Sequence, residues 1–199
     1  MKTNVEFEAP TWNQVYDMLL GQTEKIRQSG FKPDVIVGVL KGGWFSARVL
    51  SDLLEVPGLA TVTVEFYVGV AETKNAPVLT QRISAVIDGK KALIVDDVAD
   101  TGKSLKLVKD HVLQEGAKEV RTATVYRKPW SAIKPDYCEK ETSLWIVFPW
   151  ETKETVRKFV EKHCDKRAIN METAKLVKAG LPQPLVERFL KEILEERDC

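Results

Sequence analysis

Apolar positions in this chain fall into short runs that alternate with longer segments of helical spacing. Five runs rich in apolar and β-branched residues are predicted to be strands: Val35–Leu40, Thr61–Tyr67, Ala92–Val95, Val120–Val125 and Leu144–Phe148. Between them, apolar residues at helical spacing predict helices that start at Thr11, before Phe45 and before Leu105. Strands that alternate with helices indicate an α/β fold, with a mostly parallel, twisted sheet flanked by helices.

The pattern changes after Glu151, where only helical spacing remains. We therefore expect one domain over residues 1–151 and a C-terminal helical extension over 152–199. Residues 174–177 predict only a short, weak helix, whereas residues 185–194 form a clean amphipathic stripe. That stripe must be covered, either by the core of the protein or by a second subunit.

Residues 92–104 carry the most specific chemistry. The apolar run Ala92–Val95 leads into Asp96 and Asp97, and a third carboxylate, Asp100, precedes Thr101, Gly102, Lys103 and Ser104. The order predicts a buried strand, an acidic turn and a helix. Ligands of open α/β sheets bind at the carboxyl ends of strands, so a binding site is expected here.

This segment suits a phosphorylated sugar. Backbone N–H groups at the loop-to-helix junction, residues 101–104, form an anion site that the helix dipole reinforces. Asp96 and Asp97 would repel a phosphate, but they suit ribose hydroxyls or a Mg²⁺ ion. Carboxylates beside an anion-binding loop therefore suggest a ligand that contains ribose 5-phosphate.

Two alternatives compete at this segment. Gly102-Lys103-Ser104 is similar to the end of a nucleotide P-loop, but that motif needs glycine at position 97, where this chain has Asp. The acids could also simply cap a turn before an ordinary helix, although the specific residue order disfavours this.

A second anion site is predicted where the strand Val35–Leu40 ends. It runs into Lys41-Gly42-Gly43 before a helix, so two glycines expose backbone N–H groups beside a positive charge.

Composition narrows the function classes. The chain has 199 residues and a formal net charge of +1, which gives no overall attraction to nucleic acid or to a membrane surface. Its three cysteines are widely spaced and form no metal-binding or disulfide pattern. No apolar signal core is seen at the start, so we expect a cytoplasmic protein.

The stretch from Val95 to Ser104 resembles the phosphoribosyl pyrophosphate (PRPP) motif of type I phosphoribosyltransferases. Its Asp-Thr-Gly ending resembles the 6-oxopurine branch of that family, and the Pro149-Trp150-Glu151 ending of the last strand is most similar to the xanthine-guanine group. The resemblance covers about Thr11 to Glu151. It implies a purine-salvage enzyme that transfers 5-phosphoribosyl from PRPP to N9 of guanine, hypoxanthine or xanthine.

The resemblance also implies roles for residues at matching positions. Asp100 would be the catalytic acid–base group. The other implied ligand-binding residues are Lys41, Gly42 and Gly43 for pyrophosphate; Asp96 and Asp97 for ribose hydroxyls; Ala99, Thr101, Gly102, Lys103 and Ser104 for the 5-phosphate; and Lys128, Trp145 and Ile146 for the base. Lys128 would donate to the 6-oxo group, Trp145 would stack on the purine, and the backbone of Ile146 would contact the 2-position. Mg²⁺ would be held by Asp97 and Glu151.

Further expectations follow from the family. The peptide bond between Leu40 and Lys41 would be cis, and residues 68–81 would form a lid over the reacting centre, with a plain hairpin as the alternative. Family lids often carry a Ser-Tyr pair that this segment lacks. Beyond them, Ile83, Ala85 and Ile87 alternate toward a turn at Asp88-Gly89. The expected partners are small molecules (PRPP, the base, the nucleotide and pyrophosphate), with a homodimer or higher homo-oligomer as the assembly.

Other functions remain open at this point. A PRPP-sensing regulator with the same fold would bind nucleic acid, but it needs a basic face or an added module. Transfer to adenine is disfavoured because a lysine donor at position 128 suits an oxo group rather than an amine. The sequence does not indicate which of the three 6-oxopurines is the preferred substrate.

Overall fold

The structure, a computed structural model, describes residues 6–67, 76–163 and 165–197. The chain divides into two compact units. One runs from Tyr16 to Ser143, and the other joins the segment before Tyr16 to the segment after Ser143. The expected boundary at residue 151 therefore does not coincide with the division into compact units.

The unit from Tyr16 to Ser143 is built on a six-stranded sheet with the order β4-β3-β2-β5-β6-β7. Its strands are β2 (Val35–Leu40), β3 (Leu59–Tyr67), β4 (Ala76–Gln81), β5 (Lys91–Ala99), β6 (Glu119–Arg127) and β7 (Tyr137–Glu141). All neighbours pair in parallel except β3 and β4, which are antiparallel. The carboxyl ends of the five parallel strands therefore lie at one edge of the sheet, as the mostly parallel arrangement predicts.

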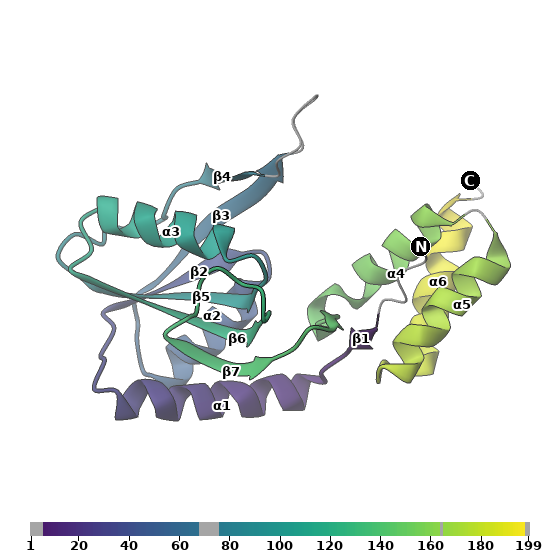
Figure 1. The fold of residues 1–199 in the computed structure, drawn as a ribbon, viewed down its shortest axis with the longest axis horizontal. Helices are drawn as coiled ribbons and strands as arrows, with labels where there is room; N and C mark the ends of the chain where they lie inside the picture. Colours follow the sequence, from purple (N-terminus) through teal and green to yellow (C-terminus); the bar gives the residue numbers. More distant parts are fainter. Residues whose placement is uncertain (1–5, 68–75, 164, 198–199) are drawn as a thin grey trace. The chain divides into compact units, whose positions relative to one another are not determined.

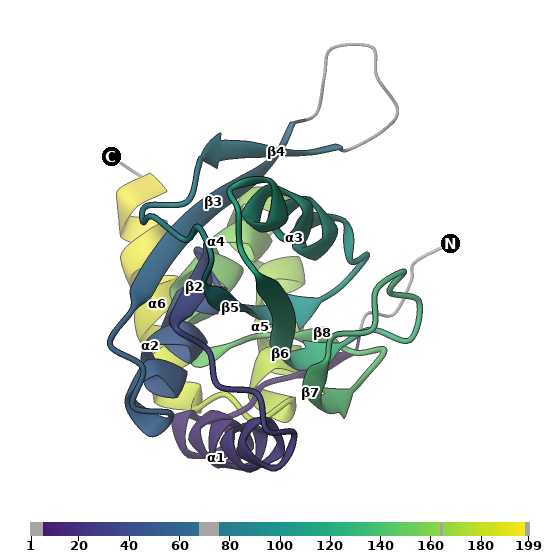
Figure 2. The same ribbon diagram turned by 90° about the vertical axis from the view of Figure 1, so that its left-hand side faces the viewer.

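Helices flank this sheet on both faces. Figures 1 and 2 show α3 (Lys103–Gln114) on one face, with α2 (Gly43–Leu53) and α1 (Trp12–Gln28) on the other. The core between α3 and the sheet contains apolar side chains such as Val37, Ile94 and Val108, which are fully buried. Both faces of β2 and β5 are covered, which explains why β2 and residues 92–95 of β5 are continuous apolar runs.

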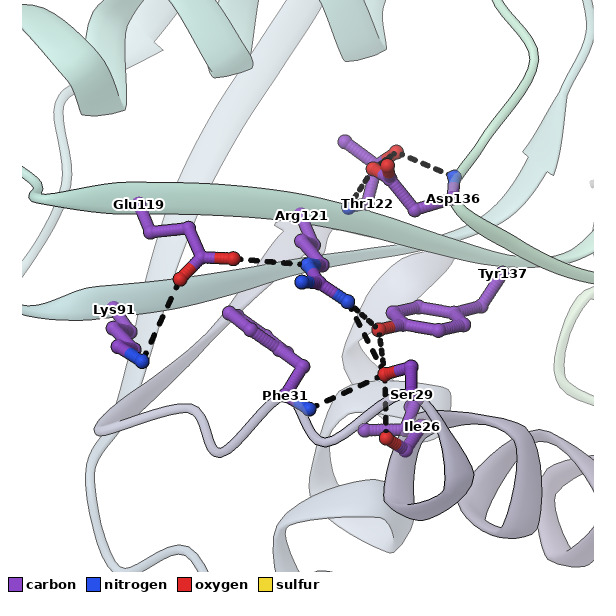
Figure 3. Close-up of polar contacts among 9 residues, drawn as sticks. All are labelled: Ile26, Ser29, Phe31, Lys91, Glu119, Arg121, Thr122, Asp136 and Tyr137. Atoms are coloured by element: carbon purple, nitrogen blue, oxygen red, sulfur yellow. Dashed lines mark hydrogen bonds and ion pairs between the residues drawn. The ribbon is translucent and has the colours of Figure 1, made fainter.

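A polar cluster fixes the start of β7 to the end of α1 (Figure 3). The hydroxyl of Tyr137 lies 2.6 Å from Ser29 Oγ and accepts a hydrogen bond of 2.7 Å from Arg121 Nη1. Nearby, the Thr122 backbone N–H and hydroxyl both donate to Asp136 Oδ2, each at 2.8 Å. These contacts lie near the amino ends of β6 and β7, at the opposite edge of the sheet from the strand ends that carry the predicted site.

The other unit contains a two-stranded parallel sheet and three helices. Its elements are β1 (Phe7–Glu8), β8 (Trp145–Ile146), a 3₁₀ turn (Pro149–Glu151), α4 (Thr152–Lys162), α5 (Lys166–Lys178) and α6 (Gln183–Arg197). Apolar side chains of the three helices form one core, and Lys153 pairs with Glu192 at 2.6 Å to link α4 to α6. The amphipathic stripe of residues 185–194 is thus covered by α4 and α5. None of the helices in the described ranges is long and apolar enough to cross a membrane.

Several expectations about local structure need correction. The strand predicted over Ala92–Val95 continues to Ala99, because β5 pairs with β6 as far as Ala99 opposite Arg127. Asp96 and Asp97 therefore belong to a strand, and not to a turn. The strand predicted over Leu144–Phe148 is reduced to two residues that pair with β1.

The segment after β3 differs in part from expectation. Residues 76–81 form β4, antiparallel to β3, so the hairpin alternative is confirmed for them; residues 68–75 of the expected lid lie outside the described residues. The alternating Ile83, Ala85 and Ile87 form no strand, but all three pack on the core, and the turn at Asp88-Gly89 is confirmed by a positive φ of 69° at Gly89.

Candidate active site

Two helices begin at the carboxyl edge of the sheet, on either side of β5. The helix α3 starts after Gly102, which has a φ of 78°, and α2 starts after Gly42. Both N-cap residues are glycines and therefore have no side chain that could cap the helix. The backbone N–H groups of each first turn have no partner within the helix, so both helix starts can bind anions.

Gly102 is required by its surroundings as well as by its backbone angle. A Cβ atom there would lie 2.9 Å from the backbone nitrogen of Ile133 and 3.0 Å from Ser131 Oγ. A side chain would therefore push away the segment that follows β6. The first predicted cradle, residues 99–104, thus has the form expected of a phosphate loop.

The second cradle lies directly against the acidic pair. A Cβ on Gly42 would overlap the carboxyl group of Asp97, and a Cβ on Gly43 would lie 2.7 Å from the Cα of Asp96. The peptide bond between Leu40 and Lys41 is cis, which confirms the expectation from the family. The structure thus brings Lys41-Gly42-Gly43 and Asp96-Asp97 together.

A cavity of about 450 Å³ opens at this edge. It is lined by Asp96, Asp100 and the loop from Thr101 to Ser104, together with the ends of β2 and β3. Two apolar lining residues of β3, Val64 and Phe66, were not predicted as site residues. Phe66 is half exposed, at 49 %, and a large exposed ring that lines a cavity is the signal that could have found it once the fold was known.

The two adjacent carboxyl groups hold protons more tightly than free aspartate. Desolvation raises the pKa of Asp97 to about 6. Desolvation, and then the neighbouring charge of Asp97, raise the pKa of Asp96 well above its usual value. The negative charges of Asp96 and Asp97 are unfavourable in the absence of a ligand. A bound cation or hydroxyl donors beside the two carboxylates would therefore stabilise their ionised form.

Asp100 and Lys128 come together because of the register between β5 and β6. Ala99 pairs with Arg127, so the next residue of each strand leaves the sheet beside the other, and Lys128 N donates to Ala99 O at 3.0 Å. The sequence analysis did not include Trp130 in this site. Its indole Nε1–H donates to Asp100 Oδ1 at 2.8 Å, and Lys128 Nζ lies 5.7 Å from its ring centroid.

The remaining predicted residues belong to the other compact unit. Trp145 is 57 % exposed and lines a cavity of about 340 Å³ with Phe7, Phe159 and three lysines. Ile146 is buried in the short sheet. Glu151 Oε1 accepts the N–H of Phe148 at 3.1 Å, so one carboxylate oxygen holds the turn before α4.

The model of the family described as "Phosphoribosyl transferase domain" matches residues 11–156. The chain belongs to this family. Residues 95–104 lie within the matched range, and this is the family that their resemblance implied.

Known proteins agree with this membership. The xanthine-guanine phosphoribosyltransferase of Cereibacter sphaeroides is 31 % identical over 132 residues, which cover 63 % of this chain and 76 % of that protein. The enzyme of the same name from Gluconobacter oxydans is 28 % identical over 152 residues, which cover 74 % and 86 %. A purine phosphoribosyltransferase of Pyrococcus horikoshii has a solved structure with 40 % identity and a TM-score of 0.67, covering 73 % of this chain and 94 % of that one.

The donor set of this phosphoribosyl transferase domain fits a hard cation held by few protein ligands. In the described parts of the chain, no group of three or more His, Cys, Asp or Glu side chains could hold a metal ion. Mg²⁺ usually binds through one or two carboxylates and takes its other ligands from water and substrate phosphates. The carboxyl pair Asp96-Asp97, with raised pKa values and beside an anion cradle, is compatible with that mode.

Proposed function

We propose that this protein transfers the 5-phosphoribosyl group from PRPP to N9 of a 6-oxopurine: guanine, hypoxanthine or xanthine. The C1'–O bond to pyrophosphate breaks, the C1'–N9 bond forms, and the proton of the purine imidazole passes to the enzyme. The products are a purine nucleoside 5'-monophosphate and pyrophosphate. The observation that carries the proposal is the pair of open helix starts on either side of Asp96-Asp97, with Asp100 lining the same cavity as the phosphate loop.

The two cradles suit the two phosphorylated ends of PRPP. Residues 99–104 and the start of α3 would hold the 5-phosphate, where backbone N–H groups and the helix dipole favour an anion. Lys41 and the N–H groups of Gly42 and Gly43 would hold the departing pyrophosphate. Between them, Asp96 and Asp97 would accept hydrogen bonds from the ribose hydroxyls.

Three residues are proposed to bind the base. Lys128 would donate to the 6-oxo group and stabilise negative charge that develops on the purine. Trp145 would stack on the ring, and the backbone of Ile146 would contact the 2-position. Asp100 would handle the imidazole proton as general base or acid. The names of the relatives support a purine substrate.

Mg²⁺ is proposed as the cofactor, held by Asp97 and Glu151. Bound there, it would supply positive charge to neutralise the leaving pyrophosphate.

Release of pyrophosphate tests the proposal. The protein is incubated with PRPP and Mg²⁺, and with hypoxanthine, guanine, xanthine, adenine or uracil in turn. We expect release with one or more 6-oxopurines and not with adenine or uracil. If no base supports release while PRPP still binds, the enzymatic proposal is wrong, and a PRPP-sensing regulator becomes the better account.

A further inference from the structure

Trp130 occupies a tight turn directly after β6. Ser131 N donates to Lys128 O at 3.0 Å, which closes a turn with Pro129 at its second position, where proline is favoured. The indole is 57 % exposed. A large aromatic side chain this exposed contributes little to core packing, so its role is sought in the contacts that it makes.

The indole contacts the two residues proposed to act on the base. Its Nε1–H, a donor with no acceptor capacity, hydrogen-bonds Asp100 Oδ1 at 2.8 Å. Lys128 Nζ lies 5.7 Å from the ring centroid, within the range of a cation–π interaction. One side chain therefore links a carboxylate at the end of β5 to an ammonium group at the end of β6.

The turn that carries Trp130 is itself fixed to the phosphate loop. Ala132 N donates to Thr101 O at 3.2 Å. The close packing of Gly102 against Ser131 and Ile133, described above, joins the same two segments. The turn that carries the indole is thus fixed to the phosphate loop by backbone contacts.

We propose that Trp130 is a positioning residue for base transfer. It holds one oxygen of Asp100 by hydrogen bonding and leaves the other oxygen for the proton of the purine imidazole. Through its ring face it also keeps the ammonium group of Lys128 in a fixed place relative to that carboxylate. The Asp100 carboxylate and the Lys128 ammonium group then have the same geometry relative to the bound purine at each turnover. Fixed orientation of reacting groups lowers the activation barrier. This inference rests on the proposed function.

The test compares Trp130→Phe, Trp130→Leu, Asp100→Asn and the double variant Trp130→Phe/Asp100→Asn. Phe keeps a ring under Lys128 and removes only the N–H donor, whereas Leu removes both interactions. Trp12→Phe is the matched control, because Trp12 is also exposed, at 54 %, and belongs to the other compact unit. For each protein, kcat, the KM for PRPP, the KM for the base and the melting temperature are measured.

We expect Trp130→Phe to lower kcat about tenfold, equivalent to about 1.4 kcal/mol of barrier, with the KM for PRPP and the melting temperature unchanged. In the Asp100→Asn background the same substitution should change kcat less than twofold, since the positioned carboxylate is already absent. Trp130→Leu should in addition raise the KM for the base severalfold. Trp12→Phe should behave as wild type.

Two results would overturn the inference. One is wild-type kcat in Trp130→Phe, and the other is an equal loss in both backgrounds, which would indicate a general structural role. The experiment distinguishes failure of the proposed function from failure of the Trp130 inference. A wild-type protein that is inactive with every base refutes both. An active wild type with an unaffected Trp130→Phe refutes the inference alone.

Discussion

Substituting Asp97 by Asn should stabilise the metal-free protein while weakening its binding of PRPP. Burial raises the pKa of Asp97 in the folded state to about 6, from an ordinary value of 3.8. The folded state therefore binds this proton more tightly than the unfolded state does, and stability decreases as pH rises from 3.8 to about 6. The side chain of Asn keeps the oxygen that accepts the Val98 N–H at 2.7 Å, so the substitution removes the charge and retains the hydrogen bond.

The magnitude follows from the size of the pKa shift. Raising this pKa from 3.8 to about 6 corresponds to about 3 kcal/mol at pH 8, because a change of one in pKa is worth about 1.4 kcal/mol. The side chain is partly exposed, so we expect Asp97→Asn to raise the free energy of unfolding by about 1–3 kcal/mol at pH 8. At pH 5, where much of the folded population is already protonated, about half of this gain should remain.

Urea unfolding with EDTA present measures the gain at the two pH values. Asp52→Asn serves as a control, because this carboxylate is 74 % exposed and its loss should change stability by less than about 0.5 kcal/mol. Binding of PRPP with Mg²⁺, measured by calorimetry, should be weaker in Asp97→Asn than in the control. A variant that is less stable than wild type at pH 8, or whose gain is the same at both pH values, would refute the reasoning.

Three further predictions concern single side chains. Asp100→Asn should lower kcat by about 10²–10⁴-fold with little effect on PRPP binding, and near wild-type turnover would remove Asp100 from the acid–base role. Lys128→Ala should raise the KM for the purine far more than the KM for PRPP, whereas equal changes in steady-state kinetics would contradict its contact with the 6-oxo group. Tyr137→Phe removes the hydroxyl that contacts Arg121 and Ser29, so it should lower the free energy of unfolding by about 1 kcal/mol in urea titrations. Its kcat should stay unchanged, and a loss of activity without a loss of stability would contradict the separation of the two sheet edges.

The sequence predicted the elements that carry the phosphate chemistry because each has a strong local signal. β2 and residues 92–95 of β5 are continuous apolar runs, and each strand leads into a glycine-containing loop before a helix. Such patterns define strand, loop and helix without knowledge of distant contacts. The cis peptide at Lys41 came from the family resemblance, since the residues alone do not indicate it.

Other elements lack a local sequence pattern that would predict their secondary structure. β7 is the edge strand Tyr137–Glu141, and its charged side chains give no apolar alternation, as is common for strands at sheet edges. The helix α5 spans Lys166–Lys178, whereas the apolar residues at 174–177 predicted only a short, weak helix. In the structure Thr173 is buried, and its hydroxyl donates to Ile169 O at 3.0 Å, so a polar residue occupies a core position.

Trp130 could not be placed in the site from sequence. Its partner Asp100 is thirty positions away, and their contact depends on the register of two parallel strands. No local pattern fixes that register. The sequence shows only a Lys-Pro-Trp turn, which is equally typical of an exposed loop.

The central claim is that PRPP and a 6-oxopurine are joined in one coupled reaction. The most direct measurement follows pyrophosphate and nucleoside 5'-monophosphate together, the second by mass spectrometry, in reactions with guanine, hypoxanthine or xanthine. The account predicts equal amounts of the two products with at least one of these bases, and neither product without a base. Pyrophosphate without nucleotide would mean hydrolysis of PRPP, and the absence of both products with every base would contradict the account.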